Sequence, residues 1–217
     1  MPRRTNRAPA ATQRHRTEPL HQLRIIGGEW RGRRFRFPAT ADGIRPTPDR
    51  VRETLFNWLQ GRVAGVRALD LYAGSGALGL EALSRGAREV VFVDMDRAAT
   101  RGIESTLTTL ACNRGRVLAA SAAQYLRGPP EPFDLVFVDP PYASGDVEAV
   151  CAALASGNWL ARDARVYMER AAEAGEPALP AGWRLLRSKR AGEVGYHLAA
   201  TTDHPEASRP GAPTTHG

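Results

Sequence analysis

The stretch ALDLYAGSGALG, residues 68–79, is an apolar run that ends in an acidic residue and then opens into glycines. It predicts a buried parallel strand, a tight turn and the start of a helix. Gly74, Gly76 and Gly79 fit the pattern G-x-G-x-x-G, in which glycines let the backbone turn sharply and let a nucleotide-bearing ligand approach closely. Since such turns also occur where nothing binds, the surrounding sequence has to decide whether this is a cofactor site.

Strand and helix patterns alternate along the chain around this turn. Strands are predicted at residues 66–71, 89–94, 116–119, 133–138 and 164–168, with a closing hairpin of residues 183–188 and 194–199. Helices are predicted at residues 77–85, 122–127 and 147–155, and after Asp96, which caps a helix with Ala99, Ile103, Leu107 and Leu110 on one face. This alternation predicts an α/β fold, a parallel sheet wound with helices on both faces.

Two strand-like runs and an amphipathic helix precede the sheet. Residues 23–37 predict a hairpin, and along residues 33–37 arginines alternate with aromatic residues, which gives the hairpin one basic face. That face is suited either to contact RNA or to lie solvated at an edge. In the helix that follows, Thr47 is the expected N-cap and Pro48 the first helical residue. Its apolar face is predicted to carry Val51, Leu55, Trp58 and Leu59.

Three arginines, Arg45, Arg50 and Arg52, stand near the start of this helix. Cations are unfavourable at the positive end of a helix dipole, so we expect an anion to share the neighbourhood. The alternative is that these arginines pair with Asp49 and Glu53.

The length of 217 residues suits one α/β unit with appendages. We expect a disordered basic arm at residues 1–22, a hairpin-and-helix extension at 23–61, the main domain at 62–200 and a disordered tail at 201–217. Cys112 and Cys151 have no companions at metal-ligand spacing, so we expect neither a disulfide framework nor a metal site. Without a signal-like or membrane-spanning run, the sequence predicts a cytoplasmic protein, and without a coiled-coil pattern, a monomer.

The net charge of +7 is concentrated at the front of the chain. Residues 1–60 carry 13 Arg and 5 acidic residues, whereas the remainder carries 17 basic and 18 acidic residues. This asymmetry indicates a polyanion partner, because arginine neutralises phosphates and releases their counterions. The alternative is a general preference for arginine, since Lys189 is the one lysine in the sequence.

Acidic residues follow three of the predicted strands: Asp70, Asp94 and Asp139. In doubly wound sheets, ligands bind beyond the carboxyl ends of the strands, where the strand order reverses. Asp94 comes 18 residues after Gly76, close to the spacing of an acid that accepts the hydroxyl protons of a ribose. A dinucleotide or S-adenosylmethionine would both suit this arrangement.

The sequence Asp139-Pro140-Pro141-Tyr142 distinguishes these two ligands. It has the form [DNS]-P-P-[YFW], which is typical of methyltransferases that act on planar amino groups. The lone pair of such an amine is delocalised into the ring, so acceptors at its two protons are needed to turn the lone pair toward a methyl donor. The Asp139 carboxylate and the Pro140 carbonyl supply those acceptors, the two prolines fix the backbone, and Tyr142 offers a face for base stacking.

With both motifs present, the chain resembles the RsmD family, bacterial methyltransferases that modify the N2 amine of a guanine in small-subunit (16S) ribosomal RNA. The resemblance extends from about residue 23 to residue 199. It is carried by RIIGG with Arg31-Gly32, by RPTPDRVRE (residues 45–53), by DLYAGSGALGLEALSRG (residues 70–86) and by FVDPPY (residues 137–142). The block at residues 45–53 is the part that points to this family among amino methyltransferases.

The resemblance implies a Rossmann-like class I methyltransferase whose cofactor is S-adenosylmethionine. The implied cofactor residues are Asp70, Tyr72, Ala73, Gly74, Ser75, Gly76, Asp94, Met95, Ser121 and Ala122. Many methyltransferases place an acid after the third strand, whereas this chain has Ser121-Ala122-Ala123, so the backbone or Ser121 would contact the adenine. The implied RNA-binding residues are Arg31, Arg33, Arg34, Arg45, Thr47, Arg50 and Arg52.

Three alternatives remain open at this stage. Asp-Pro-Pro-Tyr would also serve an adenine-N6 methyltransferase acting on DNA or RNA. A nicotinamide-dependent oxidoreductase would use the glycine turn but would give Asp139 to Tyr142 no role. A non-enzymatic assembly factor would bind ribosomal RNA, or an assembling small ribosomal subunit, through the basic front of the chain.

Overall fold

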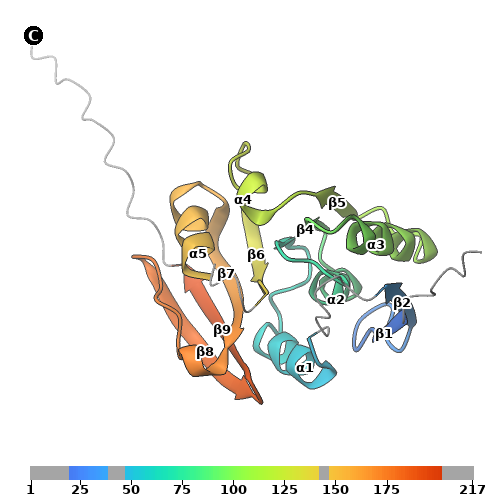
Figure 1. The fold of residues 1–217 in the computed structure, drawn as a ribbon, viewed down its shortest axis with the longest axis horizontal. Coiled ribbons are helices and arrows are strands. Elements are labelled where there is room, and N and C mark those ends of the chain that lie inside the picture. Colours follow the sequence, from blue (N-terminus) through green and yellow to red (C-terminus); the bar gives the residue numbers. More distant parts are fainter. Residues whose placement is uncertain (1–19, 39–46, 142–146, 202–217) are drawn as a thin grey trace, which may run out of the picture.

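A computed structural model of the chain describes residues 20–38, 47–141 and 147–201 (Figure 1). The strands are β1 (Leu20–Arg24), β2 (Arg34–Pro38), β3 (Arg67–Asp70), β4 (Glu89–Asp94), β5 (Gly115–Ala119), β6 (Phe133–Val138), β7 (Leu160–Ala171), β8 (Trp183–Ala191) and β9 (Val194–Thr201). The helices are α1 (Asp49–Trp58), α2 (Ala77–Ser84), α3 (Arg97–Thr109), α4 (Ala122–Tyr125) and α5 (Val147–Ser156), with a 3₁₀ turn at Ala172–Ala174.

The main sheet has the strand order β5-β4-β3-β6-β7-β9-β8. The strands from β5 to β7 are parallel, and β9 is antiparallel to both of its neighbours. The predicted doubly wound sheet and its closing hairpin are therefore confirmed. The order reverses between β3 and β6, so the carboxyl ends of these two strands mark the expected ligand site.

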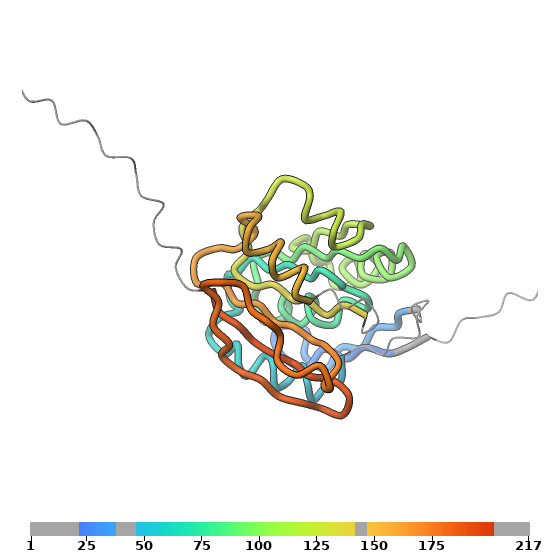
Figure 2. The backbone as a smooth tube through the Cα atoms, turned by 60° about the vertical axis from the view of Figure 1, so that its left-hand side comes forward, coloured from blue at the N-terminus to red at the C-terminus, as the bar shows by residue number. Residues whose placement is uncertain are grey.

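Alternating side chains of the central strands form one core on each face of the sheet. Val90 and Phe92 of β4 pack with residues of α1, α2 and α3, whereas Val91 and Val93 pack with residues of α4 and α5. Figures 1 and 2 show the β8–β9 hairpin at one edge of this sheet, beside α1. The ring of Trp58 in α1 stacks on Tyr196 of β9 at 5.3 Å.

Strand β7 is longer than the sequence predicts. The expected strand covered residues 164–168, whereas β7 pairs with β6 from Leu160 and with β9 as far as Ala171. Charged residues such as Asp163 interrupt the apolar pattern at its start. The extension depends on hydrogen bonds to neighbouring strands, which a local pattern does not contain.

The predicted N-terminal hairpin is confirmed, since β1 and β2 pair antiparallel. Leu23 and Phe37 are buried in the core shared with α1 and α2, so the hairpin packs on the main sheet unit. Arg24 and Arg34 are register partners and share a face, and Arg36 is also exposed. The hairpin therefore has one apolar and one basic face, as its alternation indicates.

The segment between the two strands is attached to α2 by a buried carboxylate. Glu81 is fully buried, and its two carboxylate oxygens accept hydrogen bonds from the backbone N–H groups of Ile26 and Gly27, both at 2.8 Å. Ser84, one turn later, accepts from the Trp30 N–H at 2.9 Å and donates to the Gly27 carbonyl at 2.6 Å. Gly28 is required here, because a Cβ at this position would lie 1.9 Å from the Ser84 carbonyl oxygen.

Helix α1 begins differently from the prediction. Its N-cap is Pro48, its first residue is Asp49, and the expected cap Thr47 makes no capping hydrogen bond. The buried Thr47 hydroxyl instead donates to Oδ2 of Asp139, at 3.3 Å. The prediction of Thr47 as N-cap is therefore wrong: the helix begins one residue later than predicted, and the Thr47 side chain is turned toward a carboxylate 92 residues away.

Candidate active site

The glycine turn between β3 and α2 has the backbone that its sequence predicts. Gly74 and Gly76 have φ angles of 50° and 75°, in the left-handed region that suits glycine. Gly79 serves a different purpose, since a Cβ there would lie 2.2 Å from the ring of Phe92. The first two glycines shape the turn, and the third lets α2 pack closely on β4.

Two of the predicted acids stabilise this turn. Asp94, at the end of β4, accepts hydrogen bonds from the N–H groups of Gly74 and Asp96, both at 2.7 Å. Asp70, at the end of β3, is 2% exposed and accepts from the Gly79 N–H at 3.0 Å. Burial is the main cause that raises the pKa of Asp70 to about 7. The hydrogen bond from Gly79 lowers this pKa, whereas the negative charges of Asp139 and Asp94 raise it further.

The other predicted cofactor residues surround the turn. Tyr72 is partly buried beside the core under α4 and α5, Ala73 and Ala122 are buried, and Ser75 is partly exposed. Met95, directly after Asp94, is 77% exposed, which is unusual for a large apolar side chain.

Ser121 is the N-cap of α4. Its hydroxyl accepts from the Gln124 N–H at 3.2 Å and donates to Oε1 of Gln124 at 3.1 Å. The same Gln124 oxygen accepts from the Ser121 N–H at 3.0 Å, which completes a capping box. Since the cap uses both the hydroxyl and the amide of Ser121, this residue is poorly suited to contact an adenine.

These residues fit a cofactor that carries a ribose and positive charge. A Cβ at Gly74 would meet no atom nearer than the Tyr72 carbonyl at 3.9 Å, so the outer side of the turn is open. The carboxylates of Asp70 and Asp94 lie on either side of the turn as acceptors, and exposed Met95 offers an apolar surface.

Asp139 and Pro140 follow β6 at the point where the strand order reverses. Asp70 at the end of β3 pairs in register with Phe137 of β6, so Asp139 lies just beyond this pair. Asp139 is partly buried and Pro140 is buried. Desolvation raises the pKa of Asp139 to about 6, against the hydrogen bond from Thr47. Pro141 is partly buried, and Tyr142 lies outside the described residues.

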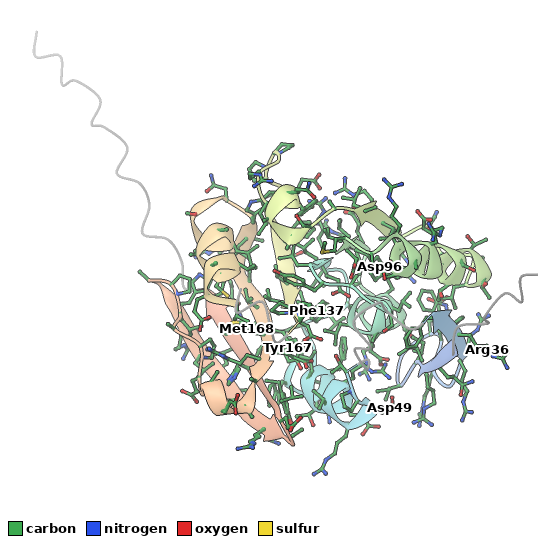
Figure 3. The ribbon with its side chains drawn as sticks, viewed as in Figure 1. Arg36, Asp49, Asp96, Phe137, Tyr167 and Met168 are labelled. Atoms are coloured by element: carbon green, nitrogen blue, oxygen red, sulfur yellow. The ribbon has the colours of Figure 1, made fainter. Side chains whose placement is uncertain are left out.

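A fourth carboxyl, which the sequence analysis missed, lies in the same region. Glu169 on β7 is 2% exposed and accepts a hydrogen bond from the Tyr167 hydroxyl at 2.7 Å. Figure 3 shows Tyr167 beside Phe137, and their ring centroids are 6.3 Å apart. A signal for Glu169 exists in the sequence, because it follows the predicted strand at 164–168 as Asp139 follows its own strand.

The predicted RNA-binding residues fall into three groups. Arg31, Arg33 and Arg34 are exposed on or beside the β1–β2 hairpin, and Arg50 is exposed on α1. Thr47 lies inside the site against Asp139, as described above. Arg45 lies outside the described residues.

Arg52 requires a correction. Its side chain is 1% exposed, and its guanidinium donates to Asp49 at 2.6 Å, to Glu81 at 3.5 Å and to the Arg24 carbonyl at 2.9 Å. The prediction that Arg52 contacts RNA is wrong, because its guanidinium is buried and carboxylate and carbonyl groups within the protein take its donors. The alternative pairing with Asp49 is the one observed.

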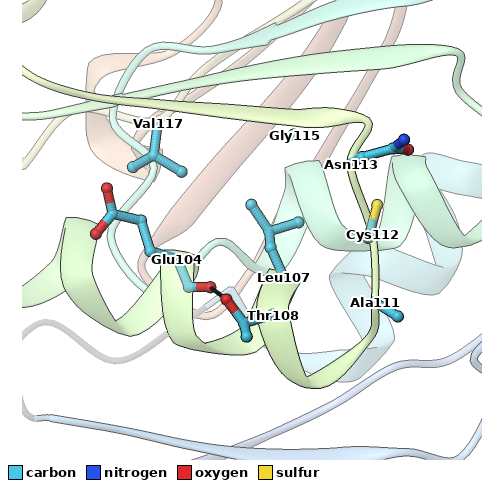
Figure 4. Close-up of a pocket in the computed structure, with 8 residues that line it drawn as sticks. All are labelled: Glu104, Leu107, Thr108, Ala111, Cys112, Asn113, Gly115 and Val117. Atoms are coloured by element: carbon cyan, nitrogen blue, oxygen red, sulfur yellow. Dashed lines mark hydrogen bonds between the residues drawn. The ribbon is translucent and has the colours of Figure 1, made fainter.

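A cavity of about 490 Å³ lies away from this site (Figure 4). It is formed by the second half of α3 and the start of β5, including Leu107, Cys112 and Gly115. Because it opens near the amino end of β5, it is remote from the carboxyl ends where Asp70, Asp94 and Asp139 gather.

A parallel sheet extended by an antiparallel β9, with acids gathered where its strand order reverses, defines a Rossmann-like class I methyltransferase. Enzymes of this class use S-adenosylmethionine as methyl donor. A family model described as Conserved hypothetical protein 95 matches residues 23–200. The chain belongs to this family, the RsmD family of ribosomal RNA small subunit methyltransferases.

Individual relatives agree with this assignment. Ribosomal RNA small subunit methyltransferase D of Escherichia coli K12 is 47% identical over 177 residues, which cover 82% of this chain and 89% of the relative. The protein of the same name in Haemophilus influenzae is 40% identical, with 82% and 93% covered. The solved structure of yhhF from Escherichia coli is 46% identical with a TM-score of 0.78, covering 84% and 99%. Family membership leaves the nicotinamide-dependent alternative without support.

Proposed function

We propose that this enzyme transfers a methyl group from S-adenosylmethionine to the exocyclic N2 amine of a guanine in 16S ribosomal RNA. The observation that carries the proposal is the position of Asp139, which lies beside β3 at the reversal of strand order, with Oδ2 hydrogen-bonded to buried Thr47. The relatives named above support ribosomal RNA as the substrate class. Such a substrate would place the protein in the cytoplasm.

The chemistry depends on how the amine is held. S-adenosylmethionine, when bound, supplies an electrophilic methyl group. Asp70, Asp94, the Gly74–Gly76 turn and Met95 would hold it, by carboxylate acceptors and an apolar surface. The Asp139 carboxylate and the Pro140 carbonyl would accept the two protons of the amine and orient its lone pair. The rings of Pro140 and Pro141 restrict the backbone around that carbonyl, and Tyr142 would stack on the base.

The basic face of the hairpin supports contact with RNA. Arg24 and Arg34 are direct cross-strand neighbours, an arrangement of like charges that destabilises an isolated hairpin. Arg24 has Asp49 at 3.5 Å, whereas no acidic side chain within residues 20–38, 47–141 and 147–201 forms an ion pair with Arg34 or Arg36. Phosphates of the RNA would compensate this charge.

The test is transfer of tritiated methyl from S-adenosylmethionine to small ribosomal subunits isolated from cells without the endogenous modification. We expect label in N2-methylguanosine after digestion to nucleosides. Asp139→Ala should lower the rate by about 100-fold or more while binding of S-adenosylhomocysteine is retained. Label in N6-methyladenosine would show that the target base is adenine and would contradict the proposed guanine specificity. An RNA-binding assembly factor would show no label and no loss of function in Asp139→Ala.

A further inference from the structure

Thr47 carries a buried hydroxyl, next to the amine-holding carboxylate, that the proposed chemistry does not use. The residue lies just before α1 and is 7% exposed, and its hydroxyl donates to Oδ2 of Asp139 at 3.3 Å. Among the described residues, Thr47 is the one side chain that donates a hydrogen bond to this carboxylate. The contact joins the segment before α1 to the end of β6, 92 residues further along the chain.

The backbone of Thr47 is held by a buried arginine. Nε of Arg52, whose side chain is 1% exposed, donates to the Thr47 carbonyl at 3.3 Å. The same guanidinium donates to Oδ1 of Asp49 at 2.6 Å and to the Arg24 carbonyl at 2.9 Å, so its orientation is fixed by several acceptors. Thr47 is therefore anchored through its carbonyl while its hydroxyl is directed at Asp139.

The proposed reaction needs the Asp139 carboxylate in one orientation. A displacement of about 1 Å in a reacting or orienting group can cost about 100-fold in rate. The terminal torsion of an aspartate side chain has broad minima, so a carboxylate without a fixed partner rotates readily. The hydroxyl on Oδ2 restricts this rotation. It also favours the ionised carboxylate, since donation from Thr47 lowers the pKa of Asp139 against the desolvation that raises it to about 6.

We propose that Thr47 is a positioning residue for methyl transfer: its hydroxyl fixes the rotation of the Asp139 carboxylate that accepts a proton of the amine. This inference rests on the proposed function, since it takes Asp139 as the group that meets the amine. It gives Thr47 a role in the rate of the chemical step, instead of the RNA contact predicted from the sequence.

Substitutions at Thr47 separate the hydroxyl from the rest of the side chain. Thr47→Val keeps the shape but removes the donor, so the single-turnover rate of methyl transfer to saturating small ribosomal subunits should fall about 10- to 100-fold. Thr47→Ser keeps the donor, and its rate should stay within about threefold of the parent. The control Thr109→Val removes an exposed hydroxyl that donates to the Ser105 carbonyl within α3, and it should leave the rate unchanged.

Binding measurements distinguish positioning from RNA contact and from a structural role. The Kd values of the subunits and of S-adenosylhomocysteine should be the same for the parent, Thr47→Val and Thr47→Ser. A weaker Kd for the subunits with an unchanged rate in Thr47→Val would assign Thr47 to RNA binding and overturn the proposal. Equal losses of rate in Thr47→Ser and Thr47→Val would also overturn it. Thr47→Ala, which removes the hydroxyl and adds no bulk, replaces Thr47→Val if that variant loses S-adenosylhomocysteine binding.

The pH profile of the single-turnover rate gives a further readout. Loss of the Thr47 donor makes the Asp139 carboxylate easier to protonate, so the acidic limb should move to higher pH in Thr47→Val and stay in place in Thr47→Ser. The titratable groups that interact with the charge of Asp139 are Asp70 at the end of β3 and Tyr167 and Glu169 on β7, and all three are unchanged in these variants.

A titration without RNA tests the contact itself. In protein labelled with carbon-13 at the aspartate carboxyls, the Asp139 resonance is identified by its absence from Asp139→Asn. Its pKa should be about 6 in the parent and in Thr47→Ser, and higher in Thr47→Val. A pKa that is the same in the parent and in Thr47→Val would refute the contact. If the parent enzyme yields no N2-methylguanosine, the proposed function fails, whereas this titration still decides whether Thr47 holds Asp139.

Discussion

At the scale of single residues, we expect Asp70 to make cofactor binding depend on pH. Its pKa of about 7 in the free protein results mainly from burial. S-adenosylmethionine carries a sulfonium and an ammonium group, so its binding favours the carboxylate form and releases a proton. We expect its affinity to rise by up to about tenfold per pH unit below pH 7 and to level off above.

Calorimetry at pH 6, 7 and 8, in buffers with different ionisation enthalpies, measures both the affinity and the proton release. Asp70→Asn serves as the control, because it should bind more weakly and without this pH dependence. An affinity of the parent protein that does not change across this range would contradict the role given to Asp70.

Some site residues could be predicted from the sequence and others could not. Asp70, Asp94 and Asp139 were found because each follows an apolar strand, and the structure gathers them at one edge of the sheet. Thr47 and Arg52 were misjudged, since their partners Asp139 and Glu81 lie far along the chain. The local pattern predicted a helix cap at Thr47 and an exposed cation at Arg52, whereas hydrogen bonds to Asp139 and Glu81, distant in sequence, orient these two side chains.

At the scale of elements, the packing of α2 on β4 depends on the third glycine of the turn. The ring of Phe92 occupies the space that a Cβ at position 79 would need. Gly79→Ala should therefore destabilise the protein by about 1–3 kcal/mol through overpacking, measured by denaturant unfolding. If the clash is the cause, the double variant Gly79→Ala with Phe92→Leu will lose less than the sum of the two single changes.

The basic face of β2 should determine much of the RNA affinity. Replacing Arg34 and Arg36 by Gln removes two cations, so the slope of log K against log salt concentration should decrease by about 1.4–1.8. The control is the same replacement at Arg184 and Arg187, which are exposed on β8 at the edge of the main sheet. Fluorescence anisotropy with 16S RNA fragments at several salt concentrations tests this, and equal effects of both pairs would indicate general charge attraction.

Most of the elements could be predicted from the sequence. The apolar runs of β4 and β6 gave correct bounds, and Asp96 caps α3 as expected. The basic alternation of β2 correctly predicted an apolar and a charged face. The full length of β7 was missed because its ends depend on pairing with β6 and β9.

At the scale of the whole molecule, Glu81 joins the N-terminal hairpin segment to the sheet domain. It is fully buried and paired with Arg52 and Arg85, in addition to two backbone N–H groups. Glu81→Gln leaves Arg85 without its carboxylate and buried Arg52 with Asp49 alone, and we expect a loss of about 3–5 kcal/mol in the free energy of unfolding. Glu104→Gln, an exposed change on α3, should have no measurable effect.

Thermal unfolding and limited proteolysis together measure this effect. A docked segment released by Glu81→Gln should be cleaved near Ile26 before the main sheet unfolds. An unchanged Tm with unchanged protease resistance would mean that the apolar contacts of Leu23 and Phe37 suffice to hold the hairpin.

The topology of the sheet was predictable because alternating strands and helices of ordinary length allow few arrangements. In the part of the chain that the structure describes, no helix is both long and apolar enough to cross a bilayer. The core that the N-terminal hairpin shares with the main sheet was harder to predict from the sequence. Its polar contacts join positions 54 to 57 residues apart, which no window of local sequence contains.

These separations have a consequence for biosynthesis. Ile26 and Gly27 leave the ribosome well before Glu81, and Thr47 before Asp139, its partner 92 residues later. The residues that carry these donors are therefore synthesised before the carboxylates they bind, and contacts between residues this far apart in sequence slow folding. A nascent chain that stops before residue 139 holds all of its glycine turn but lacks the carboxylate that accepts the Thr47 hydroxyl. The proposed amine-holding site would thus be completed late in translation, when the segment that carries Thr47 packs against a strand synthesised long after it.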